Sequence, residues 1–271
     1  AAGIAVRMIA DLIVSKASDP AVLICDEKGK FVVPILSGHI GGANKLALEL
    51  AAKLGMTPVI TTATDLNAVF AIDTWAVEND YAIADISKIK LISAALLRGE
   101  TIGLASDFPI DTALPKGLTY ANSGPLGICI SYDKDKAPFD STLTLVPKAI
   151  TLGAGCKKDT RIEAFANFVA EYFLPESIVK LASIDIKAQE PCLLNFANKY
   201  KAEFTVFTAA ELAAVAGDFS TSSFVQSVTG VDNVCERAVV LAGDTELYLH
   251  KTSRNGMTIA ATAATDWRVR F

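Results

Sequence analysis

The sequence predicts an α/β protein, because apolar runs of strand length are twice followed by a glycine-rich turn and a helical pattern. The first of these units joins Phe31–Leu36 to Lys45–Leu54. The second joins Ala149–Leu152 to the amphipathic stretch that follows Thr160. Hydrophobic residues make up 51% of the 271 residues and charged residues 20%, so the chain can bury a substantial core. This length predicts two domains, or three small ones.

The composition argues against several classes of protein. A net charge of −5 offers no broad basic surface for nucleic acid or for an anionic membrane. No apolar run approaches the ~18 residues of a membrane span, and Arg7 and Asp11 interrupt the apolar N-terminal stretch. The cysteines lie far apart without a C-x-x-C pair, which is typical of free thiols in a reducing compartment. They are Cys25, Cys129, Cys156, Cys192 and Cys235. We therefore expect a cytoplasmic protein with neither a disulfide framework nor a zinc site.

The N-terminal part contains the signals of a helix, a hairpin and a strand–turn–helix unit. Helical spacing predicts a helix over Ile4–Val14. A turn-rich pentapeptide between Ala21–Cys25 and Phe31–Leu36 predicts a hairpin. Gly55 ends the helix that follows, and the next strand is expected over Pro58–Thr61.

The loop after Phe31–Leu36 is the first candidate site. Its glycines, Gly38, Gly41 and Gly42, let the backbone turn tightly and approach a ligand, and His39 lies at the tip. The following helix is expected to point free N–H groups at this loop, which suits an anionic group. A structural turn with a hydrogen-bonded histidine explains the same residues. The spacing matches neither G-x-G-x-x-G nor a phosphate-binding loop, so nucleotide binding is not indicated.

The end of the next predicted strand is polar. Thr61, Thr62, Thr64 and Asp65 emerge there, and ligands gather at the carboxyl ends of strands in open α/β sheets. These side chains are therefore expected to face His39. A threonine-rich turn that caps the next helix is the alternative interpretation.

The middle of the chain shows no chemical motif and is interpreted as a scaffold or a lid. Its predicted elements are helices over Thr74–Tyr81 and Ile86–Leu97 and strands over Thr101–Ala105 and Leu126–Ser131. The segment 107–124 is expected to connect the two strands. The turn-rich segment 133–140 indicates a domain boundary.

The last part begins with a predicted strand, Ala149–Leu152, and a second glycine turn, Gly153-Ala154-Gly155-Cys156-Lys157-Lys158. Thr160 and Glu163 have capping-box spacing at the start of the next helix. A glycine turn, two lysines and a helix N-terminus together predict an anion site. Two merely solvated lysines are the alternative.

Further signals define the C-terminal end. Thr208-x-x-Glu211 predicts another capping box, and Asp232 is expected to cap a helix that carries Glu236 in its first or second turn. Asn255-Gly256 predicts the turn of a closing hairpin. His250 lies on its first strand and is interpreted as structural.

Several of these motifs recur together, in this order, in one family. They are Ala2-Gly3-Ile4-Ala5-Val6-Arg7, Asp19-Pro20-Ala21-Val22, the segments 36–44 and 58–65, Gly153-x-Gly155-Cys156-Lys157-Lys158, Ser183-Ile184-Asp185-x-Lys187 and Gly230-Val231-x-x-Val234-Cys235-Glu236. Over essentially its whole length the chain resembles the CbiG family, the cobalt-precorrin-5A hydrolases of anaerobic cobalamin biosynthesis. It departs from the family's pattern in lacking a strand ahead of Gly3 and in carrying Asp11 where proline is usual. We therefore expect an opening strand to be missing from this sequence.

The resemblance implies a fold in three parts. They are an N-terminal α/β sandwich-type domain over 1–72, a small middle α/β domain over 73–147, and a C-terminal three-layer α/β domain over 148–271. The implied reaction opens the ring A δ-lactone of cobalt-precorrin-5A with water and releases the C-20 fragment as acetaldehyde, giving cobalt-precorrin-5B. Cobalt comes with the substrate, so no cofactor and no metal site of the protein are implied.

The candidate site residues follow from the motifs and the resemblance. His39 is the first choice for the base, since the pKa of histidine lies near neutrality, and Asp65 or Glu236 is expected to orient or replace it. The substrate is expected in a cleft between the N- and C-terminal domains. The residues expected to bind it are Gly3, Arg7, Ser37, Gly38, Gly41, Gly42, Asn44, Thr61, Thr62, Thr64, Gly153, Gly155, Cys156, Lys157, Lys158 and Gly230.

Other functions remain open on the sequence. The leading alternative is a non-catalytic tetrapyrrole carrier of the same pathway, and a folded but inactive fragment is another. A nucleotide-dependent α/β enzyme is disfavoured by the missing phosphate-binding motifs. The expected partners are the cobalt-corrinoid substrate, a second copy in a homodimer and, transiently, neighbouring pathway enzymes, without nucleic acid or membrane.

Overall fold

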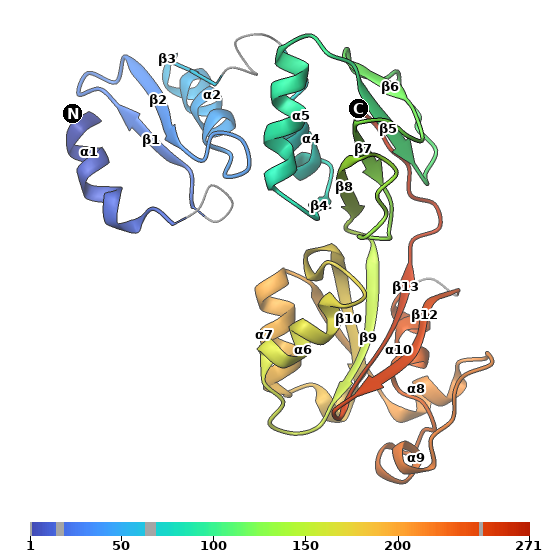
Figure 1. The fold of residues 1–271 in the computed structure, drawn as a ribbon. Coiled ribbons are helices and arrows are strands. Elements are labelled where there is room, and N and C mark those ends of the chain that lie inside the picture. The colour runs from blue at the N-terminus through green and yellow to red at the C-terminus, as the bar shows by residue number, and fades with distance from the viewer. Residues whose placement is uncertain (1, 15–18, 63–68, 244–245) are drawn as a thin grey trace.

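The computed structural model describes residues 2–14, 19–62, 69–243 and 246–271. Within them the chain forms three sheets that follow one another along the sequence, each with its own helices (Figure 1). The prediction of an α/β fold is thereby confirmed.

The N-terminal sheet contains the predicted hairpin. Its strands are β1 (Val22–Cys25), β2 (Phe31–Leu36) and β3 (Thr57–Pro58), in the order β1-β2-β3. β1 and β2 are antiparallel, while β3 pairs with β2 in parallel. The prediction that this last strand covers Pro58–Thr61 is wrong. The amide of Thr57 donates to the carbonyl of Lys30, just before β2, and that of Val59 donates to Val32 of β2, but Pro34 has no N–H with which to continue the ladder.

Two helices accompany this sheet. α2 (Ala43–Leu54) ends, as predicted, at Gly55 in the left-handed conformation. α1 (Ala2–Ile9) continues into the 3₁₀ turn η1 (Ala10–Leu12), so the predicted helix over Ile4–Val14 begins earlier and ends earlier. The amide of Val14 instead donates to the carboxylate of Asp19 at 3.0 Å. α1 buries none of its side chains and lies on the side of the sheet away from the middle domain (Figure 1).

The middle sheet has the order β4-β8-β7-β5-β6. Its strands are β4 (Tyr81–Ile83), β5 (Ile102–Ser106), β6 (Leu118–Tyr120), β7 (Leu126–Ile130) and β8 (Ser141–Pro147). The helices α4 (Ile72–Glu78) and α5 (Ser87–Leu97) lie on the side that faces the N-terminal domain (Figure 1). The predicted helix over Thr74–Tyr81 is too long at its end, because Asp80 is left-handed and Tyr81 begins β4. β4, β6 and β8 were not predicted from the sequence.

The C-terminal sheet has the order β11-β10-β9-β13-β12, with β9, β10 and β11 parallel. Its strands are β9 (Ile150–Cys156), β10 (Ile178–Ile184), β11 (Glu203–Phe207), β12 (Leu247–Arg254) and β13 (Met257–Ala263). The helical elements are α6 (Ile162–Ala170), η2 (Pro175–Ser177), η3 (Asp185–Lys187), α7 (Pro191–Tyr200), α8 (Ala209–Ala214), α9 (Ser223–Thr229) and α10 (Cys235–Ala242). The predicted capping box at Thr208 and hairpin turn at Asn255-Gly256 are both present.

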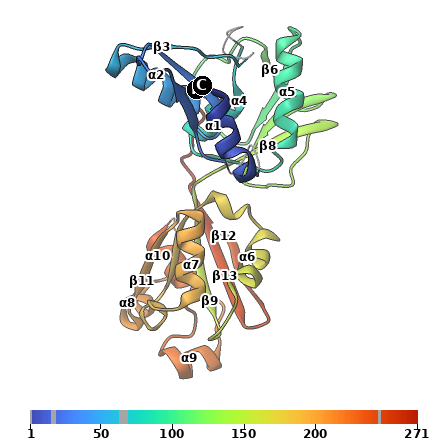
Figure 2. The same cartoon turned by 90° about the vertical axis from the view of Figure 1, so that its left-hand side faces the viewer.

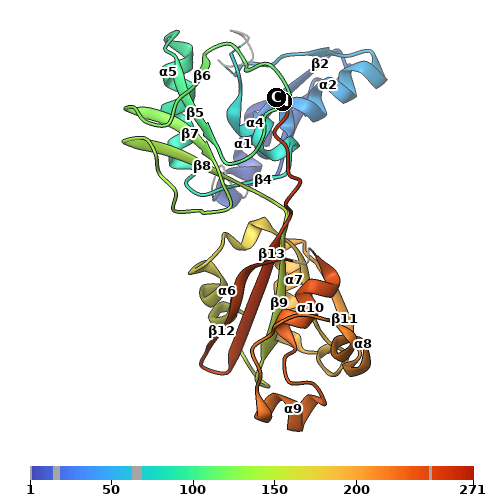
Figure 3. The same ribbon diagram turned by 90° about the vertical axis from the view of Figure 1, so that its right-hand side faces the viewer.

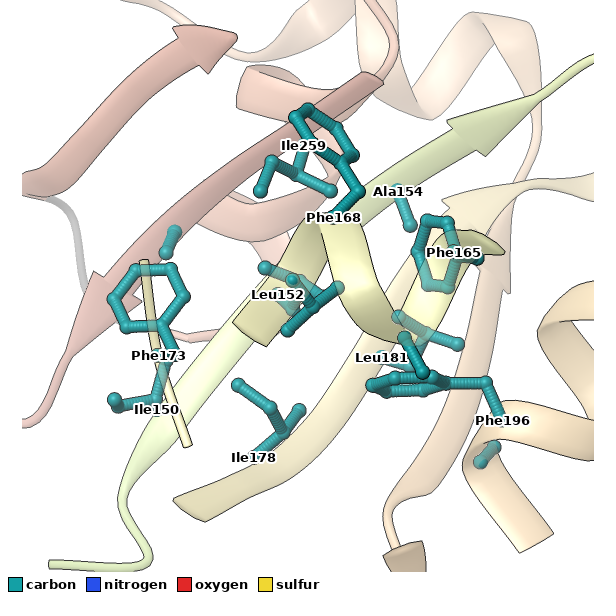
Figure 4. Close-up of a cluster of buried hydrophobic side chains, with 14 of the residues drawn as sticks. Ile150, Leu152, Ala154, Phe165, Phe168, Phe173, Ile178, Leu181, Phe196 and Ile259 are labelled. Carbon is teal, nitrogen blue, oxygen red and sulfur yellow. The ribbon is translucent and has the colours of Figure 1, made fainter. Parts of the chain in front are cut away.

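This sheet is covered on both faces, as the three-layer expectation requires (Figures 2 and 3). Leu152 and Ala154 of β9 point toward α6 and α7, where the aromatic rings of Phe165, Phe168 and Phe196 are fully buried (Figure 4). α10 packs on the other face. Successive side chains of a strand point to opposite faces of the sheet, so β9 packs against the helices on both faces.

The second glycine turn predicted from the sequence is wrong. Gly153, Gly155 and Cys156 belong to β9, which runs straight through them. A Cβ atom at Gly153 would lie 1.9 Å from the carbonyl oxygen of Cys235, so this glycine allows α10 to approach the sheet closely. The capping box predicted at Thr160 is also absent: α6 begins after Arg161, and the Thr160 hydroxyl donates to the carbonyl of Lys157 instead.

The end of the chain returns to the middle domain. Val269 is buried and pairs with Ile110, and the indole N–H of Trp75 donates to the carbonyl of Arg270 at 3.0 Å. Phe271 stacks on Trp75 with 4.6 Å between the ring centroids. The tail therefore packs with the middle domain although it follows the C-terminal sheet in sequence.

The two glycines of β9 give a test of this packing. Gly153→Ala should lower the free energy of unfolding by about 1–3 kcal/mol, because the new methyl group collides with the backbone of α10. Gly155→Ala is the matched control, since nothing lies within 4 Å of its Cβ position. Urea denaturation followed by circular dichroism measures both. Equal effects of the two substitutions would contradict the packing described.

Candidate functional site

The His39 loop lies where the N-terminal domain meets the middle domain. The Nδ1 atom of His39 lies 3.1 Å from Oδ1 of Asp73 and 2.8 Å from the hydroxyl of Thr74, and both of these residues belong to α4. The His39 and Asp73 side chains are only 7% and 5% exposed. A carboxylate accepts hydrogen bonds but does not donate them, so this contact favours the tautomer with the proton on Nδ1.

The backbone of the loop is shaped by two left-handed residues, Ser37 and Gly42, and by a close contact at Gly41. Ser37 is buried in a left-handed conformation with φ of 56°, and a Cβ atom at Gly41 would lie 2.3 Å from the Cβ of Ser37. Gly42, with φ of 79°, precedes α2. Only glycine at position 41 leaves room for this loop.

The expectation that the start of α2 offers free N–H groups to an anion is not met at two positions. The amides of Ala43 and Asn44 donate to the carbonyls of Ser37 and Gly38 at 3.0 and 2.9 Å. The loop therefore caps its own helix, and an anion would have to displace or avoid these bonds.

The polar strand end contributes in part. The side-chain amide of Asn44 donates to the hydroxyl of Thr62 at 2.9 Å, which ties the loop to the segment after β3. Thr61 is exposed beside it. The predicted residues Thr64 and Asp65 lie outside the described residues.

Two pockets adjoin His39. One, of about 520 Å³, is lined by Gly38, His39, Thr62 and Asp73 together with side chains of α5 that include Lys90. The other, of about 490 Å³, is lined by the glycine loop and by α2 and α4. His39 therefore stands between two spaces of the size that small-molecule sites occupy.

Asp73 and Thr74 are the contacts that the sequence did not reveal. The hydrogen bond joins residues 34 positions apart, across two domains. The available signal was local: an aspartate and a threonine at the start of a helix, which suggests only a cap.

Gly3 and Arg7 lie on α1, on the outer side of the N-terminal sheet, and both are exposed (Figure 1). The structure therefore does not bring them into the lining of either His39 pocket. Their predicted role in binding stays a prediction that this arrangement does not support.

Glu236 occupies a different place from His39. It lies in the first turn of α10 and is 1% exposed. Its carboxylate accepts hydrogen bonds from the amides of Lys251 and Ser220, at 2.8 and 2.9 Å, and from the side chain of Asn233. Burial raises the pKa of this carboxyl, but the hydrogen bonds outweigh burial and hold the pKa below its ordinary value.

These contacts give Glu236 a structural role in the C-terminal domain. It joins the loop before α9, the start of α10 and the strand β12. The predicted cap Asp232 instead pairs with Arg237, while the Asn233 side chain accepts from the amide of Glu236. The expectation that Glu236 orients or replaces His39 is not supported by these contacts.

A third pocket, of about 570 Å³, lies in the C-terminal domain. Its lining includes the predicted residues Gly155, Cys156 and Lys157, at the carboxyl end of β9. Gly153, Lys158 and Gly230 are not among the lining residues, and Gly230 ends α9 in the left-handed conformation. We name this space the C-terminal pocket.

The expected common cleft is not formed in this arrangement. β9 begins beside the middle domain, where Ala264 accepts a hydrogen bond from the hydroxyl of Tyr132, and it runs away from that junction. The carboxyl ends of β9 and β10 and the α9 helix lie at the far end of the domain (Figures 1 and 3). Because β9 and β10 are parallel, both strands end at the C-terminal pocket. The pocket therefore lies on the side of the domain that is away from the N-terminal domain.

Comparison with known proteins accounts for nearly the whole chain. Residues 1–65 match the family model described as Cobalamin synthesis G N-terminal, residues 70–147 the Cobalamin biosynthesis central region, and residues 150–262 the Cobalamin synthesis G C-terminus. The cobalt-precorrin-5A hydrolase of Salmonella typhimurium is 33% identical over 276 residues, which cover 96% of this chain and 79% of that protein. That of Priestia megaterium is 29% identical, covering 95% of this chain and 75% of that protein.

Among solved structures, a cobalamin biosynthesis protein G homologue from Sulfolobus solfataricus is 26% identical and covers 97% of this chain and 80% of that chain, with a TM-score of 0.38. The family models and the relatives agree. The three α/β domains are those of a cobalamin biosynthesis protein. More particularly, the chain belongs to the CbiG family, that of the cobalt-precorrin-5A hydrolases. None of the helices in the described residues is long and apolar enough to cross a membrane.

The network around Glu236 predicts a pH-dependent stability. Glu236→Gln should destabilise the fold by about 1–3 kcal/mol at neutral pH, because an amide nitrogen would face donors that now meet a carboxylate. Because the pKa of Glu236 in the folded protein lies below the ordinary value of 4.5, its stabilising effect is present above that pH and is lost as the pH falls through the folded pKa. The difference from the unmodified protein should therefore shrink below about pH 4.5.

Urea denaturation across this pH range measures the effect. Glu163→Gln is the control, because the Glu163 side chain is 63% exposed. A difference between Glu236→Gln and the unmodified protein that stays constant as the pH falls would contradict the assignment.

Proposed function

We propose that this protein is a cobalt-precorrin-5A hydrolase, which opens the ring A δ-lactone with water and releases the C-20 fragment as acetaldehyde. Its relatives in Salmonella typhimurium and Priestia megaterium carry that name, and the match to this chain covers most of their length. The single structural observation that carries the proposal is the buried contact between His39 and Asp73 beside two pockets.

The His39–Asp73 pair suits the two proton transfers of this reaction. With the proton of the imidazole held on Nδ1 by Asp73, Nε2 carries the lone pair that accepts a proton. Lactone opening needs a base to activate water, and release of acetaldehyde needs a base to take the alcohol proton as the carbon–carbon bond breaks. Lys90 lines the same pocket as the pair and supplies a cation for the carboxylate that forms.

The remaining features of the proposal concern what the protein binds and where it works. Cobalt arrives within the corrinoid, so the protein needs no cofactor for this chemistry. The reaction belongs in the cytoplasm, where the free thiols stay reduced. A homodimer and transient contacts with neighbouring pathway enzymes remain predictions from the sequence.

Substitution of the pair tests the proposal. His39→Ala should lower the turnover of cobalt-precorrin-5A by about 10²–10⁴-fold, as expected for loss of a general base. Asp73→Asn should lower it by about 10²-fold or more, because the amide stabilises the imidazolium poorly and can favour the other tautomer. Anaerobic incubation with the corrinoid, followed by trapping and quantification of acetaldehyde, measures both.

His250→Ala is the matched control: the His250 side chain is 79% exposed on β12 and lies 3.6 Å from Glu236 in the C-terminal domain, so its loss should leave turnover nearly unchanged. Nearly full turnover by folded His39→Ala would end the assignment of His39 as the base. If the unmodified protein binds the corrinoid and releases no acetaldehyde, the hydrolase proposal fails and the carrier takes its place.

A further inference from the structure

Two of the buried cysteines lie together, at the end of β9 and the start of α7. Cys156 is the last residue of β9, and Cys192 is the second residue of α7. Leu152 and Ala154 point toward α6 and α7 (Figure 4), and Cys156, two residues further along the strand, shares their face of the sheet. Both cysteines belong to the hydrophobic cluster between the sheet and these helices. The fold therefore brings together two thiols that are far apart in the sequence.

The two thiols are hydrogen-bonded to each other. This hydrogen bond from Cys192 stabilises the Cys156 thiolate and holds the pKa of Cys156 below its ordinary value, although burial and Glu190 raise it. The same hydrogen bond, together with burial, raises the pKa of Cys192. The thiolate is the nucleophilic form of cysteine. Cys156 is therefore the reactive member of the pair, and Cys192 keeps its proton.

The surroundings of the two cysteines are also unequal. Cys156 is 7% exposed and lines the C-terminal pocket, whereas Cys192 is 2% exposed and is not in that lining. A small oxidant in the pocket therefore meets Cys156 first. A thiol with a lowered pKa beside a second cysteine is the arrangement found in redox-sensing pairs.

The other cysteines provide a comparison within the same chain. Cys25 is exposed, while Cys129 and Cys235 are buried. Burial raises the pKa of Cys129 to about 11 and that of Cys235 to about 12. Cys235 lines the C-terminal pocket as Cys156 does. Its raised pKa and the carbonyl oxygen of Asn233 beside its thiol, 3.7 Å away, set it apart from Cys156.

We propose that Cys156 and Cys192 form a reversible disulfide when the protein meets hydrogen peroxide, and that this bond protects Cys156 from irreversible oxidation. The Cys156 thiolate attacks one oxygen of the peroxide, the O–O bond breaks, and the other oxygen leaves as hydroxide, so that Cys156 becomes a sulfenic acid. The Cys192 sulfur then attacks the Cys156 sulfur. The S–O bond breaks, and the oxygen leaves with the proton of Cys192 as water.

The two steps balance as one oxidation. Both sulfurs are oxidised to the disulfide, and the peroxide is reduced to two molecules of water. A thiol reductant reverses the reaction by thiol–disulfide exchange. Neither step uses His39, so the pair and the proposed function stand or fall separately.

Treatment of the full chain with hydrogen peroxide, in a Cys25→Ser background, tests the pair. This substitution removes the exposed thiol and leaves four of the five cysteines. After denaturation in N-ethylmaleimide, mass spectrometry should show two blocked thiols in the oxidised protein and four in the reduced protein. Peptide mapping should find Cys156 joined to Cys192, and dithiothreitol should restore all four thiols.

Cys192→Ser removes the second thiol of the pair and keeps a hydroxyl that can donate to the Cys156 thiolate. Dimedone should then trap Cys156 as a sulfenic acid, and excess peroxide should add oxygen atoms to Cys156 that dithiothreitol does not remove. Cys156→Ser should leave Cys192 reduced. Cys235→Ser is the matched control, since Cys235 is 2% exposed like Cys192, and it should change the rate of disulfide formation by less than about twofold.

Three results would overturn the proposal. They are four free thiols after peroxide treatment, a disulfide between another pair, and irreversible oxidation of Cys156 that is as fast with Cys192 present as in Cys192→Ser. Thermal melting shows whether each variant is folded. If Cys192→Ser does not fold, peptide mapping of the Cys25→Ser protein still decides which cysteines pair, and its recovery in dithiothreitol decides whether Cys156 is protected.

Discussion

The close approach of α10 to β9 at Gly153 determines how the C-terminal domain is built. Since no Cβ atom fits between the strand and the carbonyl of Cys235, the helix lies directly on the sheet. This position places Glu236 within hydrogen-bond distance of the backbone of β12. α10 begins at Cys235, above Gly153, and does not extend over Gly155. The strand is therefore uncovered at Gly155. One steric contact therefore accounts for both the buried carboxylate network and the pocket.

The candidate catalytic pair depends on a different contact, between domains. His39 comes from the N-terminal loop and Asp73 from the first turn of α4, so the pair exists only while these domains are packed together. The exposed pair of Lys45 and Glu78, 3.5 Å apart, contributes little to that packing. Ile40, next to His39, packs on the core of the middle domain and contributes apolar burial.

The sequence predicted only part of what short-range chemistry determines, since the capping box expected at Thr160 is absent. The hairpin turn at Asn255-Gly256 and the capping box at Thr208 depend on neighbouring residues and are present. The glycines of β9 were misread, because glycine permits either a turn or a close approach, and only the location of α10 distinguishes them. Asp73 was missed as the partner of His39 for a related reason: its contact is set by domain packing, which no local pattern encodes.

The C-terminal pocket lies apart from the candidate pair of His39 and Asp73. β9 has seven residues and begins at the junction with the middle domain, so its far end lies about 20 Å away. The pair of His39 and Asp73 lies beyond that junction, where the N-terminal loop meets α4. None of the residues that line the C-terminal pocket lines either pocket at His39, so this pocket takes no part in the proton transfers proposed there in this arrangement.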